Sequence, residues 1–108
     1  MSINTKNESE SNSVDIYQII EAGDIAGVRN FIASGTDINQ VHEESGWTPL
    51  EIAAEKGKLE IAKILIEAGA IVDKGLSEPL ELAASNGFTE IVNLVLQAGD
   101  YVNKNQQK

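Results

Sequence analysis

The chain has 108 residues, 42% of them apolar and 23% charged, which is the composition of a globular domain. Its 17 acidic residues outnumber its 8 basic ones, and the net charge of −9 argues against nucleic acid or an anionic membrane surface as a partner, because both attract clustered cations. Cysteine is absent and His42 is the one histidine, which excludes disulfides, thiol nucleophiles and thiolate or multi-histidine metal sites.

The first 13 residues are rich in Ser, Asn, Glu and Thr, and Met1 and Ile3 are their only large apolar residues. Such a segment buries too little surface to offset the entropy lost on ordering, so we expect a disordered tail, which could still carry a binding motif. It lacks the apolar core of a secretory signal, and no apolar run approaches the ~20 residues of a membrane helix. We therefore expect a cytoplasmic protein, with residues 104–108 as a second short tail.

Between these tails the sequence repeats itself three times. Residues 46–73 match residues 77–103 at a constant offset of 30, and a weaker copy at residues 16–39 precedes the middle copy by 34. The matched positions of the strong copies are Pro49 and Pro79, Leu50 and Leu80, Ala53–Ala54 and Ala83–Ala84, Gly57 and Gly87, Ile61 and Ile91, and Ala68–Gly69 and Ala98–Gly99. Repetition at a period near 33 residues indicates an architecture of stacked repeats.

The middle copy predicts two short helices. Thr48 is a suitable N-cap, Pro49 suits the first helical position, and Glu51 completes a capping box with Thr48. We expect Gly57 to end this first helix in the left-handed conformation. A more apolar second helix begins at Leu59 and ends at Gly69, and a short extended stretch follows it.

Residues 48–73, TPLEIAAEKGKLEIAKILIEAGAIVD, resemble an ankyrin repeat, whose typical start is Thr-Pro-Leu-His-x-Ala. The resemblance covers residues 14–103, with repeats at about 14–45, 46–75 and 76–103. It implies an all-α solenoid of three helix–turn–helix repeats that binds a partner protein and has no chemistry of its own. The chain departs from the family where Glu51 and Glu81 replace the histidine, and where Glu78 replaces the threonine, so that Ser77 is left to cap the third copy.

The connections between repeats also depart from the family pattern. Residues 39–46 are one residue longer than the family norm and predict a projecting hairpin finger, tipped by His42, Glu43, Glu44 and Ser45 beside Trp47. Residues 73–78 are about three residues short, so the second finger should be stunted. The first copy has Gly27, Arg29 and Asn30 where the middle copy has Ile61, Lys63 and Ile64, which suits an N-terminal cap. The third keeps Ile91, Val92, Leu94, Val95 and Leu96, so a homodimer could form through that end, although we favour a monomer.

No pattern in the sequence points strongly to catalytic or metal-binding residues. The carboxylate pairs Glu51 with Glu55 and Glu78 with Glu81 would need a dry cleft for acid–base work, and the inner helices of the resembled family lie on an open, wet surface. The acidic residues near the finger lack calcium-loop spacing, and phosphate-loop, Gly-x-Ser-x-Gly and His-Glu-x-x-His motifs are absent. His42 is interpreted as an ordinary exposed polar residue at the tip of the loop. We expect no enzyme, no cofactor and no metal site.

The charge distribution suggests a class of partner. Segments 14–22, 43–56 and 78–86, which should form the finger and the concave side, hold eight acidic residues and one basic residue, Lys56. An acidic face steers basic proteins, although helix N-termini also attract acidic residues for stability. Trp47 either anchors the partner or packs against the finger. The residues predicted to bind the partner are Tyr17, Glu21, Glu44, Ser45, Trp47, Glu51, Glu55, Lys56, Glu81, Ser85 and Asn86.

Two alternatives remain open from the sequence. The apolar third copy could make the chain a self-assembling structural unit. The ordered carboxylates could instead mimic nucleic-acid phosphates and inhibit a nucleic-acid-binding protein.

Overall fold

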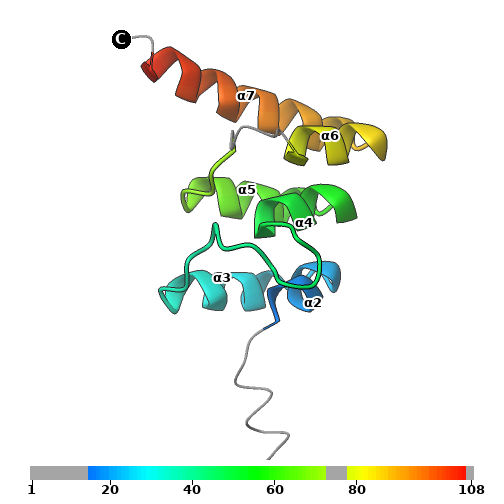
Figure 1. The fold of residues 1–108 in the computed structure, drawn as a ribbon, viewed down its shortest axis with the longest axis vertical. Helices are drawn as coiled ribbons and strands as arrows, with labels where there is room; N and C mark the ends of the chain where they lie inside the picture. The colour runs from blue at the N-terminus through cyan, green and yellow to red at the C-terminus, as the bar shows by residue number, and fades with distance from the viewer. Residues whose placement is uncertain (1–14, 73–77, 107–108) are drawn as a thin grey trace, which may run out of the picture.

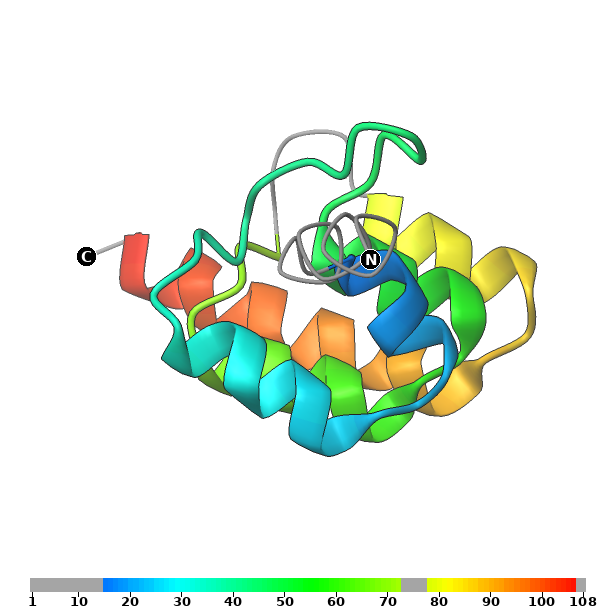
Figure 2. The same cartoon turned by 90° about the horizontal axis from the view of Figure 1, so that it is seen from below.

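The computed structural model describes residues 15–72 and 78–106 of the chain, and these form six helices. The helices are α2 (Ile16–Glu21), α3 (Ile25–Ala33), α4 (Pro49–Lys56), α5 (Leu59–Glu67), α6 (Glu78–Ser85) and α7 (Thr89–Gln106). Successive helices pair, and the three pairs stack on one another (Figure 1). Seen along the stack, α2, α4 and α6 make one row and α3, α5 and α7 a second (Figure 2). The described ranges contain no strand, and none of their helices has the length and apolarity that crossing a membrane requires.

The local signals of the middle copy act as predicted. The Thr48 side chain accepts a hydrogen bond from the Glu51 N–H (3.3 Å), and the Glu51 carboxylate accepts one from the Thr48 N–H (2.8 Å), so the capping box is confirmed. Gly57 ends α4 with φ 71°, a left-handed conformation that glycine adopts without strain.

The core lies between the two rows and runs without a break through all three repeats. Ile20, Leu50, Ile61, Leu65 and Ile91 are almost completely buried. The degenerate first copy contributes Ile20 and Phe31 at the positions its spacing predicts. Each helix pair therefore buries its apolar side against the neighbouring pair, which is why a single repeat of this length has no core of its own.

Consecutive repeats also interlock at their turns. The Phe88 ring lies over Gly57, so a Cβ at Gly57 would meet it at 2.7 Å. Lys58 stands in the equivalent place one repeat earlier, with its Nζ 3.8 Å from where a Cβ on Gly23 would be. The residue after the turn glycine therefore covers the turn glycine of the preceding repeat.

The last repeat differs from the middle one at its end. Gly69 follows α5 with φ 105°, whereas its match Gly99 lies inside α7. Glycine permits a left-handed turn without imposing one, and only after α5 does the backbone have to turn back to begin another described helix. Residues 104–106, predicted as tail, belong to α7. The predicted N-terminal tail, the linker of the second finger with Ser77, and residues 107–108 lie outside the described residues.

The two ends of the stack have different surfaces. Arg29 and Asn30 of α3 are exposed, as expected of a polar N-terminal end. In α7, Ile91 and Val95 are buried in the stack, Val92 and Leu94 are partly buried, and Leu96 is 47% exposed. The apolar surface predicted at the C-terminal end is therefore smaller than the sequence pattern suggested.

The interlock gives a matched pair of glycine variants. Both Gly57→Ala and Gly87→Ala place a side chain at a left-handed position, which costs about 1–2 kcal/mol. Only Gly57→Ala also drives a methyl group into the Phe88 ring, because no atom lies within 4 Å of a Cβ at Gly87. We expect Gly57→Ala to lower the free energy of unfolding by roughly 1–3 kcal/mol more than Gly87→Ala in urea titrations. If both variants lost the same free energy of unfolding, the contact between Phe88 and Gly57 would not stabilise the stack as described.

Candidate protein-binding face

We use the name inner face for the exposed side of α2, α4 and α6 together with the finger, residues 39–46, and the adjoining residues Trp47 and Asn86. The finger projects beyond both helix rows (Figure 2). Its turn is closed by two backbone hydrogen bonds of 2.8 Å, from the His42 N–H to the Trp47 carbonyl and from the Gly46 N–H to the His42 carbonyl. At its base, the Asn39 side-chain oxygen accepts a hydrogen bond from the Ile71 N–H (2.7 Å). The finger is thus tied to the following repeat.

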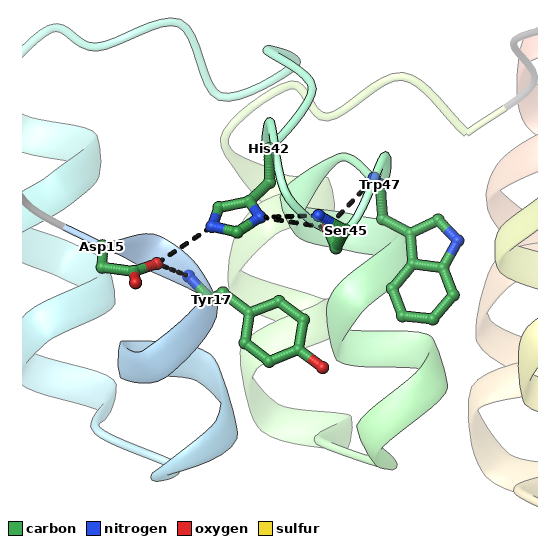
Figure 3. A network of polar contacts seen from close by, with 5 residues as sticks. All are labelled: Asp15, Tyr17, His42, Ser45 and Trp47. Atoms are coloured by element: carbon green, nitrogen blue, oxygen red, sulfur yellow. Dashed lines mark hydrogen bonds and ion pairs between the residues drawn. The ribbon is translucent and has the colours of Figure 1, made fainter.

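His42 ties the finger to the first repeat as well. Its Nδ1 accepts a hydrogen bond from the Ser45 backbone N–H (3.1 Å), which places the proton of the neutral ring on Nε2. Nε2 then donates to the Asp15 carboxylate (3.1 Å), and Asp15 also caps α2 by accepting from the Tyr17 N–H (Figure 3). The imidazole lies 5.4 Å from the Tyr17 ring, and its side chain is only 16% exposed. The interpretation of His42 as an ordinary exposed residue was wrong.

Asp15, His42 and Ser45 are the residue types of a hydrolytic triad, but their bonding is structural. Nδ1 lies 3.2 Å from the Ser45 hydroxyl oxygen, but the Ser45 backbone N–H occupies the same lone pair at 3.1 Å, which leaves Nδ1 a poor acceptor for the hydroxyl proton. That hydroxyl oxygen in turn accepts a hydrogen bond from the Trp47 backbone N–H (3.1 Å). The network therefore fixes the shape of the finger.

Lys56 connects the first and second repeats. Its Nζ lies 3.7 Å from the Glu21 carboxylate and 5.2 Å from the centre of the Tyr17 ring. A hydrogen bond with Tyr17, together with the charges of Glu21 and Glu55, raises the pKa of Lys56 above its ordinary value. The one lysine of the predicted acidic segments is thus held by side chains of this chain.

A further polar contact joins the second and third repeats. The Asn86 side-chain amide donates to the Glu55 carboxylate (3.1 Å) and to the Leu82 carbonyl (2.8 Å). Polar contacts therefore cross both junctions of the inner face, which holds the side chains of three repeats in one arrangement.

Ten of the eleven predicted binding residues reach the surface of the inner face. Those exposed are Glu21, Glu44, Glu81, Ser85 and Asn86, and those partly buried are Tyr17, Ser45, Trp47, Glu55 and Lys56. Glu51 is the exception, because it is only 8% exposed and its carboxylate is used by the capping box. Glu51 was predicted to bind the partner, and the structure instead gives it a structural role at the start of α4.

Trp47 lies on the side of the finger away from Tyr17 and packs partly against the core (Figure 3). It is neither fully buried nor a free side chain at a loop tip. Its ring can therefore support the finger and still present an edge to a partner.

The described residues show no metal site. Within them, no group of three or more histidine, aspartate or glutamate side chains is placed to hold an ion. Asp37, near the finger, accepts a hydrogen bond from the Asn39 N–H (2.9 Å), which is a local turn contact.

A family model of ankyrin repeats matches residues 16–107 with three copies, in agreement with the three helix pairs. The chain belongs to the ankyrin repeat family. Repeats of this family generally serve as protein-interaction modules and are typically non-enzymatic.

Individual relatives match about half of this chain. Human protein phosphatase 1 regulatory subunit 27 is 38% identical over 55 residues, which is 51% of this chain and 35% of that protein. The mouse 2-5A-dependent ribonuclease is 31% identical over 55 residues, 51% of this chain and 8% of that protein. The fowlpox virus putative ankyrin repeat protein FPV240 is 34% identical over 59 residues, 55% of this chain and 14% of that protein. The matches thus span between 8% and 35% of the length of these relatives.

The link between the finger and the first repeat can be measured by a double-mutant cycle. We expect Asp15→Ala and His42→Ala to be coupled by roughly 0.5–1.5 kcal/mol in urea unfolding, because each removes the same hydrogen bond. Asp24→Ala is the matched control: Asp24 caps α3 by accepting from the Gly27 N–H, as Asp15 caps α2, and it lies outside the His42 network. The same coupling energy in both cycles would contradict the assignment.

Proposed function

We propose that this ankyrin domain binds a protein with a basic or mixed-charge surface, and that the inner face, on the expected concave side, makes the contact. The observation that carries the proposal is the unequal distribution of charge along that face. Lys56 is paired with Glu21, whereas Glu43, Glu44, Glu55 and Glu81 have no ion-pair partner within residues 15–72 and 79–99. The net negative charge is therefore concentrated on the finger and the second and third repeats.

Charges without a counter-charge act over the distance of a Debye length, about 10 Å at 0.1 M salt. They would raise the rate at which a basic surface meets the inner face in the correct orientation. The cross-repeat contacts support the proposal in a second way, since side chains fixed before binding lose little entropy on binding.

Trp47 is the proposed anchor of the complex. Tryptophan is enriched among the residues that contribute most to binding energy, and Trp47 stands at the base of the finger, on the side toward the acidic second and third repeats. The name of one relative, a regulatory subunit of protein phosphatase 1, also fits a role exerted by binding.

Self-assembly through the C-terminal end is the second candidate, and the exposed Leu96 favours it. We expect a monomer mass in size-exclusion chromatography with light scattering, even at high protein concentration. A concentration-dependent dimer mass that Leu96→Ser abolishes would favour self-assembly instead.

The inner-face proposal is tested by capture from host lysate at low salt followed by kinetics with the purified partner. Trp47→Ala should raise the dissociation rate about tenfold or more, as for a binding hot spot. Glu55→Gln with Glu81→Gln should mainly slow association, and this effect should fade as salt rises. Glu60→Gln with Glu67→Gln, an equal charge change on exposed positions of α5, is the matched control. A partner that binds Trp47→Ala and the Glu55→Gln, Glu81→Gln double variant as it binds the wild type would contradict the proposal.

A further inference from the structure

The end of α6 carries a sequence feature that the binding role does not use. Asn86 is followed by Gly87, and this is the only Asn–Gly pair in the sequence. An asparagine side chain can react with the backbone nitrogen of the next residue, and a glycine there leaves that nitrogen least hindered. Asn86 is exposed, and no atom lies within 4 Å of the place a Cβ would take at Gly87. Solvent therefore reaches both residues, and no neighbouring side chain blocks the backbone of Gly87.

The native hydrogen bonds hold both reacting groups apart. The Asn86 amide donates to the Glu55 carboxylate and to the Leu82 carbonyl, and the Gly87 N–H donates to the Ala84 carbonyl (3.1 Å). All three bonds must break before the nitrogen of Gly87 can reach the side-chain carbon of Asn86. The reaction therefore depends on opening of the last turn of α6, which is a local event at a helix end.

We propose that Asn86 is a site of spontaneous deamidation and that Glu55 controls its rate. In the opened state the Gly87 backbone nitrogen loses its proton to water or hydroxide and bonds to Cγ of Asn86. The bond from Cγ to the side-chain nitrogen breaks, that nitrogen takes a proton from water and leaves as ammonia, and a five-membered succinimide forms. Water then opens the ring at either carbonyl. Opening at Cγ gives aspartate, with a carboxylate in place of the side-chain amide, and opening at the main-chain carbonyl gives isoaspartate, in which the main chain runs through Cγ. Water is the only reagent consumed.

The product weakens the junction between the second and third repeats. A carboxylate cannot donate either hydrogen bond that the Asn86 amide makes, and it faces the negative charge of Glu55. It also places a negative charge at the C-terminal end of α6, where the helix dipole disfavours it. Deamidation thus converts an attraction between α4 and α6 into a repulsion, and it adds a charge to the inner face.

Peptide mapping of the intact chain after incubation at neutral to mildly alkaline pH tests the site itself. We expect conversion at Asn86, seen as the mass change from NH to O, with an isoaspartate fraction accepted by protein isoaspartyl methyltransferase. Asn30, Asn39 and Asn93 are internal controls in the same digest, because none precedes glycine. Conversion of Asn86 no faster than that of these three would overturn the proposal.

Two variants of Glu55 test its control of the rate. Glu55→Ala removes the acceptor of the Asn86 amide, and we expect deamidation to proceed roughly threefold faster, as the loss of one exposed hydrogen bond predicts. Glu55→Gln keeps an acceptor oxygen, so its rate should stay close to that of the wild type. Circular dichroism checks that both variants are folded. Equal rates in the alanine and glutamine variants would show that Glu55 has no such control.

The effect of the product is measured with Asn86→Asp, which mimics the aspartate form. We expect this change to lower the melting temperature clearly in the wild-type background and by less in the Glu55→Gln background, where the facing charge is gone. The same loss in both backgrounds would contradict the proposed repulsion between the two repeats.

Discussion

Packing between successive helix pairs is the interaction on which the rest of this structure depends. Ile20, Leu50 and Ile61 belong to one buried cluster that runs through all three repeats, so the stack rather than the single repeat forms the core. The stack also fixes the distance between side chains on adjacent repeats. Contacts such as Phe88 over Gly57 form because the core has already set the spacing of the turns.

The stacking of the repeats also fixes the positions of the polar side chains on the inner face. Its polar side chains bond across repeat junctions, with Asp15 to His42 and Lys56 to Glu21 at the first junction and Asn86 to Glu55 at the second. The first junction pairs Glu21 with Lys56, whereas the second leaves Glu55 and Glu81 without a cation among the described residues. The polar side chains at the first junction would therefore mainly hold the face in shape, whereas those at the second junction would present negative charge to a partner.

Much of this arrangement was predictable from the sequence, because the signals are local. The capping box of Thr48 and Glu51, the left-handed Gly57 and the period near 33 depend only on neighbouring residues and spacing. The role of His42 was not predictable, since its partner Asp15 lies 27 residues away and only the stack brings them together. The same holds for Lys56 with Tyr17 and for Asn86 with Glu55. The match of Gly99 to Gly69 did not reveal that α7 continues past Gly99, because a glycine allows a helix to end but does not end it.

The central claim is that the inner face, rather than the outer row or the C-terminal end, meets the partner. Its most direct test is a ¹⁵N NMR titration of the full chain with the captured and purified partner. The account predicts that the Trp47 indole and the amides of residues 43–47, 55–56 and 81–86 shift first and most. Shifts confined to α3, α5 and α7 would contradict it and would place the binding surface on the opposite side of the stack.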